Sequence, residues 1–393
     1  MSRVAVVGGG PAGLAAAVAC RALGVDDVVV LEREAIAGGV PRHCDHTGFG
    51  LRDLRRVLRG PAYAARWVER AARAGVDVRT ATSVLDGTTS LTTTSPRGVE
   101  TIAADAVLLA TGCRERPRHA RLVPGTRPAG VLTTGALQQL VHLGRAHVGH
   151  RAVVVGAEHV SFSAVLTLRE AGCATVAMVT EHPAHQTYAP LAWIAGAPLL
   201  TRRRVVEIRG RSRVDGVVLD DGRTLACDTV VFTGDWIPDH ELARRAGLAI
   251  DAGTRGPSVD PGGRTSTPGV FAAGNLVHAA ETADLAALGG RAAATAIVDW
   301  LRTGTWPARV PVGCERPLQW VWPQALDPGM PPSLPFRLRT ATTARAALAA
   351  TQDGRTLWRS RRRWLIPNRS IGVPAHAVTG VDPRGGPVSW RLV

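Results

Sequence analysis

A glycine-rich loop between two apolar runs constrains this chain more than any other feature. Residues 4–7 predict a strand, a helical pattern follows the loop, and the next apolar run ends at Glu32. The glycines at 8, 10 and 13 match the dinucleotide fingerprint G-x-G-x-x-G position by position. Gly8 allows the tight turn, Gly10 lets the backbone approach a pyrophosphate, and Gly13 lets the helix pack closely on the strand. Glu32 is placed to accept hydrogen bonds from a ribose, so the segment predicts a nucleotide-binding βαβ unit rather than an unrelated glycine-rich turn.

The same pattern occurs a second time. Residues 152–156 match residues 4–8, a helical pattern covers 159–171, and the apolar run 175–180 ends at Glu181. Two βαβ units of this kind predict two nucleotide-binding folds in one chain.

The second loop has lost most of its fingerprint. Gly156 keeps the first glycine position, but Glu158 and Ser161 replace the second and third glycines. A carboxylate at the second position repels a pyrophosphate unless it turns away. Two interpretations therefore stay open: the second fold binds a nicotinamide nucleotide in a modified way, or it keeps the fold without the ligand. If it binds, Glu181 favours NAD over NADP, because an acid there repels a 2′-phosphate.

Further elements complete an α/β pattern. Buried strands are expected at 106–110, 229–233 and 270–275, each followed by small or polar residues. Residues 219–225 predict a hairpin with an Asp-Gly turn. The alanine-rich stretch 282–301 predicts a long helix.

From residue 304 onward the composition changes to short strand patterns, prolines and tryptophans. Runs such as 356–358 and 388–393 predict strands, and Asp353-Gly354 predicts a turn. We expect a small β-rich appendage, in which tryptophans serve for packing or for an interface rather than as a ligand cage. These tryptophans are Trp306, Trp320, Trp322, Trp358, Trp364 and Trp390.

All 47 basic residues are arginine, and the formal net charge is +15. Without lysine, Schiff-base chemistry and a phosphate-loop lysine are excluded. The arginines are scattered apart from small clusters at 202–204 and 359–363. We interpret them as solvated surface, since no nucleic-acid recognition motif accompanies them, and we expect no nucleic-acid partner.

The six cysteines lie far apart and form no C-x-x-C pair. Zinc ribbons, iron–sulfur clusters and dithiol motifs are therefore unsupported. The glycine loop begins at residue 8, which leaves no room for a signal peptide, and the apolar stretch 191–200 is too short to span a membrane. We expect a cytoplasmic protein with free thiols.

These features together resemble the two-dinucleotide-binding-domain flavoproteins, the pyridine nucleotide-disulfide oxidoreductase superfamily, over residues 1–303. The matching marks are the first loop with Glu32, the strand ends at 110–112 and 233–235, and the element 267–274. The resemblance implies an α/β fold with two Rossmann-like three-layer domains, the second inserted in the first. An FAD-binding domain would cover 1–112 and 234–303, an NAD(P)-binding-like domain 113–233, and the β-rich region 304–393.

One stretch is similar to a narrower branch of these flavoproteins. The run 38–50, together with 60–63, looks like flavoproteins encoded with glycerol-3-phosphate dehydrogenases. More distantly, the chain is similar to flavin subunits of opine, proline and hydrogen-cyanide-forming dehydrogenases. Several of those carry a cysteine-rich iron–sulfur segment that is missing here. The resemblance therefore implies another electron route or a partner subunit that carries the cluster.

The resemblance also implies where FAD binds. The family usually has Asp where this chain has Asn275, and an amide can still bond a ribityl hydroxyl. The helix after Thr282 would point its positive end at the flavin pyrimidine, unless Thr282 only caps that helix. His278 and Glu281 precede this helix and are further candidates to face the flavin. The expected cofactor-binding residues are Gly8, Gly10, Pro11, Ala12, Gly13, Glu32, Arg33, Gly39, Val84, Ala110, Thr111, Gly112, Gly274, Asn275, Thr282 and Ala283 for FAD, with Gly156 and Glu181 for NAD.

Candidate catalytic groups lie where disulfide-reducing relatives carry a cysteine pair. Here the stretch holds a single cysteine, Cys44, between His43 and His46. A nearby imidazole would lower the thiol pKa and favour a charge-transfer pair or a sulfenic acid, whereas the alternative is a loop cysteine without a redox role. The histidines are candidate acid/base groups or simple loop hydrogen bonders. The possible metal ligands in the run 43–46 are adjacent in the chain rather than at the spacing of known metal sites, so we expect no metal site. Cys113 is expected near the flavin edge or at the domain junction, without an assigned role.

Three functions remain. The first is an FAD-dependent oxidoreductase that passes hydride between a nicotinamide nucleotide, NADH favoured, or a small organic substrate and the flavin. The second is a flavin electron-transfer subunit of a multi-subunit dehydrogenase with a degenerate NAD site. The third is a non-catalytic flavin-binding interaction module built around the tryptophan-rich region. A dehydrogenase partner subunit and a homodimer are both left open.

Overall fold

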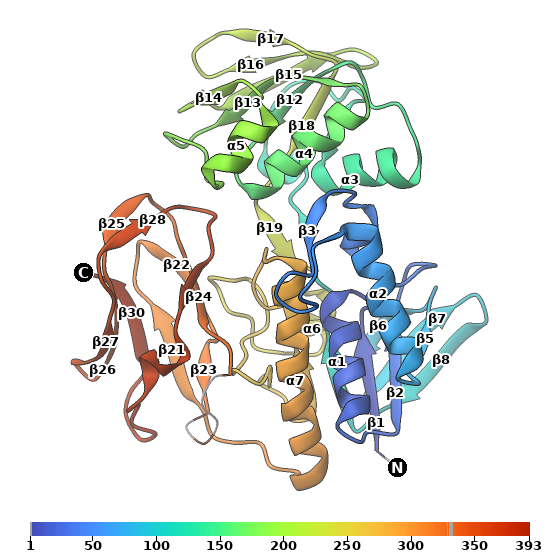
Figure 1. Ribbon diagram of the computed structural model, residues 1–393, viewed down its shortest axis with the longest axis vertical. Helices are drawn as coiled ribbons and strands as arrows, with labels where there is room; N and C mark the ends of the chain where they lie inside the picture. Colours follow the sequence, from blue (N-terminus) through green and yellow to red (C-terminus); the bar gives the residue numbers. More distant parts are fainter. Residues whose placement is uncertain (1, 328, 330–332) are drawn as a thin grey trace. The chain divides into compact units, whose positions relative to one another are not determined.

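The computed structural model describes residues 2–327, 329 and 333–393 (Figure 1). Contacts within the chain divide it into two compact units. The first comprises Met1–Arg42, Thr47–Cys113 and Pro238–Val393, and the second comprises His43–His46 and Arg114–Ile237. The chain passes between the units on either side of His43–His46, within strand β10 (Cys113–Glu115) and within β19 (Trp236–Pro238).

A five-stranded parallel sheet forms the centre of the first unit, in the order β20-β9-β1-β2-β5. The strands β20, β9, β1 and β2 are apolar on consecutive residues because both faces of the sheet are covered there, whereas the edge strand β5 carries Asp77 and Arg79. The strands expected at 4–7, 106–110 and 270–275 are confirmed, although the last is shorter than expected. The bounds are β1 (Arg3–Val7), β2 (Asp27–Leu31), β5 (Asp77–Arg79), β9 (Ala106–Leu109) and β20 (Val270–Ala272).

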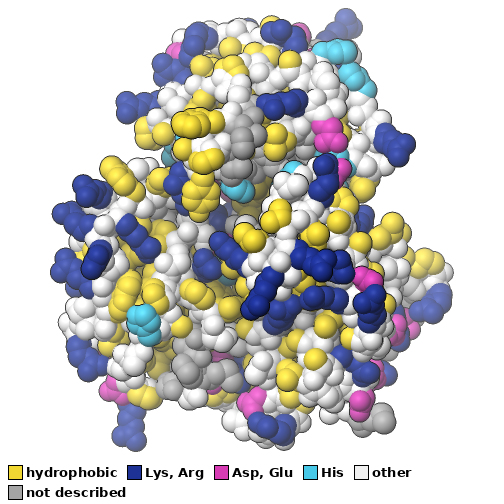
Figure 2. Space-filling view, in the orientation of Figure 1, with side chains coloured by type: hydrophobic (Ala, Val, Ile, Leu, Met, Phe, Trp, Pro, Cys, Tyr) yellow, Lys and Arg dark blue, Asp and Glu magenta, His cyan; other side chains and the backbone are white. Residues whose placement is uncertain are grey.

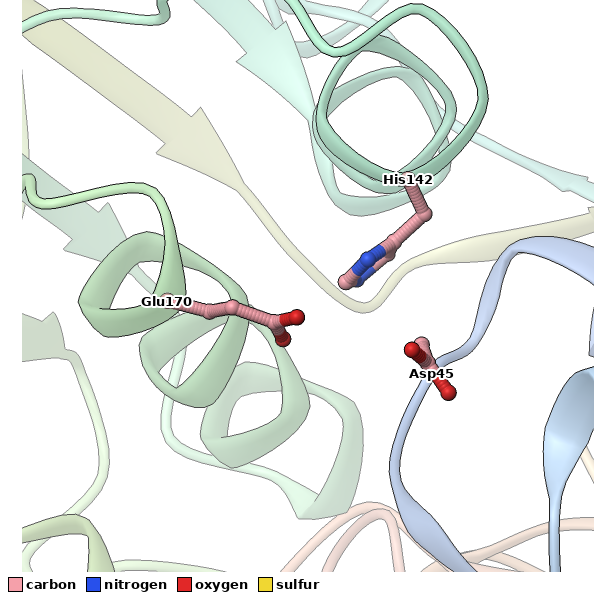
Figure 3. Close-up of side chains that lie close together, drawn as sticks. All are labelled: Asp45, His142 and Glu170. Atoms are coloured by element: carbon pink, nitrogen blue, oxygen red, sulfur yellow. The ribbon is translucent and has the colours of Figure 1, made fainter.

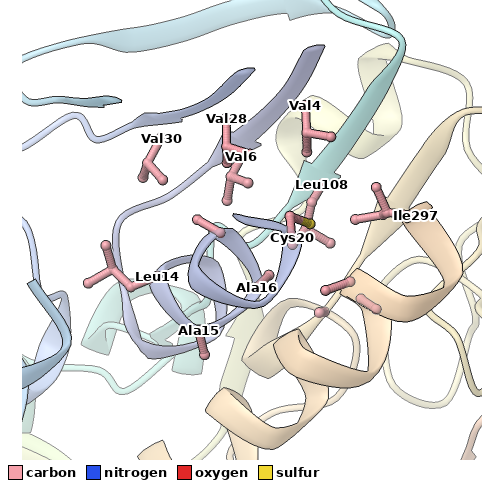
Figure 4. Close-up of a cluster of buried hydrophobic side chains, with 14 of the residues drawn as sticks. Val4, Val6, Leu14, Ala15, Ala16, Cys20, Val28, Val30, Leu108 and Ile297 are labelled. Atoms are coloured by element: carbon pink, nitrogen blue, oxygen red, sulfur yellow. The ribbon is translucent and has the colours of Figure 1, made fainter. Parts of the chain in front are cut away.

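Alternate side chains of this sheet enter two different cores. Val4 and Val6 belong to a cluster formed with the helices on one face (Figure 4). The intervening residues of β1 belong to a second cluster on the other face, which includes Trp320 and Trp322. The helices are α1 (Pro11–Ala22), α2 (Gly60–Arg73) and α7 (Ala283–Thr303), and the other face carries β6 (Ser83–Gly87), β7 (Ser90–Ser95), β8 (Gly98–Ala103) and α6 (Glu241–Arg245).

Helices α1 and α7 lie side by side, because small residues allow their backbones to approach (Figure 1). A Cβ on Gly290 would lie 2.0 Å from the carbonyl oxygen of Ala12, so only glycine fits there. Helix α7 confirms the helix expected at 282–301 and ends at Gly304, whose φ is +64°.

The second unit repeats the design with a parallel sheet in the order β11-β18-β12-β13-β14. Helices cover one face of this sheet, and an antiparallel meander covers the other. The expected helix at 159–171 and the hairpin at 219–225, with Gly222 in its turn, are confirmed. The strands are β11 (Val131–Thr133), β12 (Arg151–Val155), β13 (Ala174–Thr180), β14 (Leu199–Thr201), β15 (Val205–Gly210), β16 (Val214–Leu219), β17 (Thr224–Ala226) and β18 (Thr229–Phe232). The helices are α3 (Thr134–Gln138), the π-helix η3 (Gln139–Leu143), α4 (His159–Glu170) and α5 (Ala189–Ala195).

The C-terminal region of the first unit consists mainly of strands, as expected. It has its own core, in which Trp390 is fully buried against Phe336 and Trp358. Packing is therefore the role of this tryptophan, whereas Trp364 is mostly exposed. The strands are β21 (Val310–Cys314), β22 (Leu318–Trp322), β23 (Ala325–Leu326), β24 (Phe336–Thr340), β25 (Ala344–Ala346), β26 (Leu348–Gln352), β27 (Arg355–Arg359), β28 (Arg363–Leu365), β29 (Ile371–Val373) and β30 (Val388–Leu392).

Arginine side chains lie over every part of the face shown in Figure 2, with acidic side chains among them. This distribution agrees with solvated surface arginines rather than a single basic stripe. Across the described residues, we find no helix with the length and apolar character needed to cross a membrane.

Candidate functional site

The first glycine loop connects β1 to α1 at the carboxyl end of the sheet. Gly8 has a φ of +110°, and a Cβ there would lie 2.5 Å from the carbonyl oxygen of Ala110. A Cβ on Gly13 would lie 2.0 Å from the carbonyl oxygen of Gly8. Both glycines are therefore required by the packing of this fold, whatever binds to it.

Gly10 differs, because it is the one fingerprint glycine with space in front of it. Its Cβ would have only the Cα of Gly39 within 4 Å, at 3.9 Å. Gly10 is also the N-cap of α1, and no side chain caps the helix or places an acid in its first turn. The free backbone N–H groups and the helix dipole suit an anion, so these residues fit the pyrophosphate of a dinucleotide.

Glu32 follows β2 and is only 8% exposed. One carboxylate oxygen accepts a hydrogen bond from the backbone N–H of Gly9, and the other accepts one from the N–H of Glu34, both at 2.8 Å. The acid therefore braces the glycine loop from the adjacent strand end. Arg33 instead forms an exposed ion pair with Asp239 at 3.2 Å.

Strand β20 brings the element 267–274 to the same carboxyl end of the parallel sheet. A Cβ on Gly274 would lie 2.6 Å from the Cβ of Ala12 in α1. The Asn275 amide accepts a hydrogen bond from the N–H of Glu281 at 2.8 Å and donates one to its carbonyl oxygen at 3.2 Å. Asn275 thus closes the loop that leads into α7.

Thr282 precedes α7 at the N-cap position, but the capping role considered for its side chain is wrong. The hydroxyl caps no backbone N–H and instead donates to the carboxylate of Asp284. Ala283 begins α7, so the expected FAD residues at this end lie on the helix N-terminus. The others lie as follows: Pro11 and Ala12 in α1, Ala110, Thr111 and Gly112 after β9, and Val84 in β6, where it packs on the second core cluster.

The second glycine loop keeps the tight turn at its first glycine but not the second and third glycines of the fingerprint. Gly156 has a φ of +138°, and a Cβ there would lie 1.9 Å from the Thr233 hydroxyl. The Ser161 hydroxyl forms a 2.6 Å hydrogen bond with that same hydroxyl, so the third position is filled by a polar contact. Glu181, the equivalent of Glu32, is exposed.

Glu158 is the N-cap of α4 and is 7% exposed. Ideal Cβ positions on Gly156 and Gly234 lie 2.8 and 3.2 Å from its carboxylate oxygens, so the acid group lies over two adjacent strand ends. Its Oε1 has no hydrogen-bond partner in the described part of the chain. The carboxylate therefore stands where a pyrophosphate would meet the helix N-terminus, and this loop does not fit an anion as the first one does.

Cys44 is buried, and its thiol donates to Oε1 of Gln138 at 3.2 Å. Burial and the nearby Glu115 carboxylate raise the pKa of the Cys44 thiol to about 12. The expectation that neighbouring histidines lower this pKa is therefore wrong, because desolvation dominates. Sequence reasoning missed Gln138 and Glu115, since both are far from Cys44 in the chain and carry no motif.

His43 is buried, and His46 is partly exposed on the same short segment. His46 contributes, after burial, to the lowered pKa of His159 in α4. The acid/base roles of His43 and His46 remain predictions.

Asp45 meets two side chains that the sequence did not group with it. One possible ligand atom each from Asp45, His142 and Glu170 lies within 4.8 Å of the others (Figure 3). They come from the 43–46 segment, from η3 and from the end of α4. Carboxylate and imidazole are ligands that zinc accepts, but the cluster is open to solvent, with Glu170 exposed. We assign no ion to it.

A protein-family model described as pyridine nucleotide-disulphide oxidoreductase matches residues 2–290. The chain belongs to this family. The ferredoxin reductase component of a chlorobenzene dioxygenase from Cupriavidus sp. (strain PS12) is 30% identical over 70% of this chain and 67% of that protein. The ferredoxin–NAD(+) reductase subunit of a benzene 1,2-dioxygenase system from Pseudomonas putida is 29% identical over the same shares.

The fold comparison agrees with this membership. Thioredoxin reductase from T. acidophilum superposes with a TM-score of 0.66, covering 76% of this chain and 98% of that one, at 22% identity. The chain is thus an FAD-dependent oxidoreductase of a family that uses NAD(P)H as its nucleotide substrate. The two Rossmann-like folds inferred from the sequence are confirmed.

Proposed function

We propose that this chain passes electrons between NADH and FAD, and from FAD to a further small molecule or partner protein. The observation that carries the proposal is the uncapped N-terminus of α1, with open space at Gly10 and Glu32 bracing the loop. Bound FAD supplies a ring that accepts and returns a hydride.

The chain's own residues bind and orient the cofactor. The α1 amides beside Gly10 would hold the pyrophosphate of FAD, and Glu32 would bind its ribose. The N-terminus of α7, after Asn275 and Thr282, would lie toward the flavin end of the cofactor, and the Asp284 carboxylate in its first turn offsets part of the positive helix dipole there.

The nicotinamide nucleotide is assigned to the second fold, whose sheet and tight turn at Gly156 are intact. Glu181 supports NADH over NADPH, because its carboxylate repels a 2′-phosphate. The names of the ferredoxin reductase relatives support a partner protein as the electron acceptor.

A second candidate function is supported by Glu158. Its buried carboxylate at the N-terminus of α4 opposes dinucleotide binding. The chain would then be a flavin subunit that receives electrons from a partner dehydrogenase rather than from a soluble nucleotide.

Anaerobic titration of the FAD-loaded protein with NADH separates the two candidates. Bleaching of the flavin absorbance near 450 nm within seconds, on the order expected for turnover rates of 1–1000 per second, supports the first. A flavin that dithionite reduces but NADH does not would contradict the first proposal and support the second. A parallel titration with NADPH tests the preference assigned to Glu181.

A further inference from the structure

A small cavity lies beside the start of α7, inside the first unit. It has a volume of about 40 Å³. The flavoprotein sheet supplies one wall and the C-terminal region supplies the other. Its lining includes Asn275, His278, Glu281, Leu285, Trp322 and Arg337.

Two buried nitrogen atoms on this lining have no partner in the described part of the chain. His278 is 8% exposed and its Nδ1 makes no hydrogen bond; Trp322 is 7% exposed and its indole Nε1 makes none. The His278 ring lies between the rings of Trp320 and Trp322, with centroids 5.5 and 5.0 Å away. Both nitrogen atoms can therefore form a hydrogen bond with a molecule that enters the cavity.

The charges around the cavity favour an anion. Burial, followed by the charges of Arg339 and Arg337, lowers the pKa of His278 to about 3, so the ring is neutral and still offers one N–H. Glu281 is already paired with Arg339 at 3.7 Å. Arg337 makes no ion pair with any carboxylate among the described residues, which leaves one guanidinium charge available at the cavity.

We propose that this cavity binds the carboxylate group of a small carboxylic acid. The Arg337 guanidinium, the Trp322 indole N–H and the His278 ring N–H supply three donors around one planar anion. A single available cation balances a single negative charge, and the Glu281 carboxylate disfavours a dianion such as phosphate. The apolar part of the lining, including Leu285, suits an alkyl chain on the same molecule.

The proposal gives the C-terminal region a function, because Trp322 and Arg337 both belong to it. That the bound acid is the organic substrate of the flavin rests on the proposed function, whereas binding itself does not. The test therefore measures binding without turnover.

The experiment uses the FAD-loaded full chain and butyrate as the probe. Saturation-transfer NMR on the butyrate methyl protons should show binding, while butyramide, its neutral isostere, should give at least about tenfold less signal. Arg337→Met should abolish the butyrate signal, and His278→Phe, which keeps the ring between the tryptophans, should weaken it. Arg345→Met removes an exposed arginine of the same region and should leave the signal unchanged.

Several outcomes overturn the proposal. Equal signals from butyrate and butyramide would show an apolar pocket without anion recognition, and displacement by equimolar sulfate would show a general anion site. Absence of butyrate binding to the FAD-loaded protein would mean that the cavity serves the cofactor itself. If Arg337→Met does not fold, the comparison of butyrate with butyramide on the unmodified protein decides. The proposed function is tested separately, by reduction of the flavin with NADH. Failure of butyrate to bind would therefore not count against the proposed function.

Discussion

The two glycine loops of this chain share a backbone design and differ in what they leave open. In the first, Gly10 leaves the N-terminus of α1 uncapped and accessible. In the second, the buried Glu158 carboxylate stands at the same position of α4. The fold survives this change because Gly156 alone supplies the tight turn. The first glycine is required by the packing of both loops, and we propose that the second serves the ligand.

The acidic residues that follow the second strand of each unit also differ in burial and in hydrogen bonding. Glu32 is buried and holds two backbone N–H groups, whereas Glu181 is exposed. The third position differs too, because Gly13 is needed for close packing and Ser161 is accommodated by its bond to Thr233. Each difference can be tested by a matched pair of variants.

The largest effect is expected from Gly10→Val. The branched side chain enters the space assigned to the pyrophosphate but meets no protein atom closely, so the fold should persist while FAD binding weakens by about 100-fold or more. The purified variant should be colourless, with an unchanged far-ultraviolet circular dichroism spectrum. Gly313→Val, at an open strand position, should stay yellow. A yellow Gly10→Val protein would contradict the FAD assignment.

Glu32→Ala should be the next most severe change. It leaves the N–H groups of Gly9 and Glu34 without an acceptor, which should lower the free energy of unfolding by about 2–4 kcal/mol. Urea denaturation of the flavin-free protein measures this. Glu181→Ala should change the same quantity by less than about 0.5 kcal/mol. Equal losses of unfolding free energy in the two variants would contradict the different roles given to Glu32 and Glu181.

Glu158→Gln should strengthen NADH binding by about tenfold, since it removes one like charge from the pyrophosphate position at an interaction of order 1–2 kcal/mol. Glu170→Gln removes the same charge from the other end of α4 and should leave the affinity unchanged. An unaltered dissociation constant in the Glu158 variant, measured by fluorescence titration, would mean that this carboxylate does not oppose the nucleotide. Glu158→Gly with Ser161→Gly extends the test by restoring both glycines.

The smallest effect is expected from Ser161→Ala. It removes the hydrogen bond to the Thr233 hydroxyl, which still donates to the Val155 carbonyl oxygen at 3.2 Å. We expect a loss of about 1 kcal/mol in urea denaturation and no change in FAD content. A loss of FAD would show that a change in the second nucleotide-binding fold affects cofactor binding in the first.

The sequence predicted those features that local patterns encode. Strand β1, the turn at Gly8 and the helix after Thr282 follow from short-range periodicity and glycine spacing. It could not predict the environment of Cys44, because the buried thiol donates a hydrogen bond to Gln138, 94 residues away in the chain. The thiol pKa expected from neighbouring histidines therefore went in the wrong direction.

Two site features were likewise hidden from sequence reasoning. The direction of the Glu158 side chain depends on its position between two strand ends, which only the assembled sheet defines. The cavity beside His278 needs Trp322 and Arg337 from a region without recognisable motifs. In both cases the deciding contacts join residues far apart in the chain.

The packing of Trp320 and Trp322 under the parallel sheet limits how this polypeptide can be shortened. The family match ends at residue 290, yet these indoles share a core with Val7 and Leu31 of the nucleotide-binding sheet. A fragment that stops at the helix end would uncover that apolar surface to water. In this chain, therefore, the C-terminal region covers one face of the nucleotide-binding sheet and cannot be removed without exposing the apolar side chains of those strands.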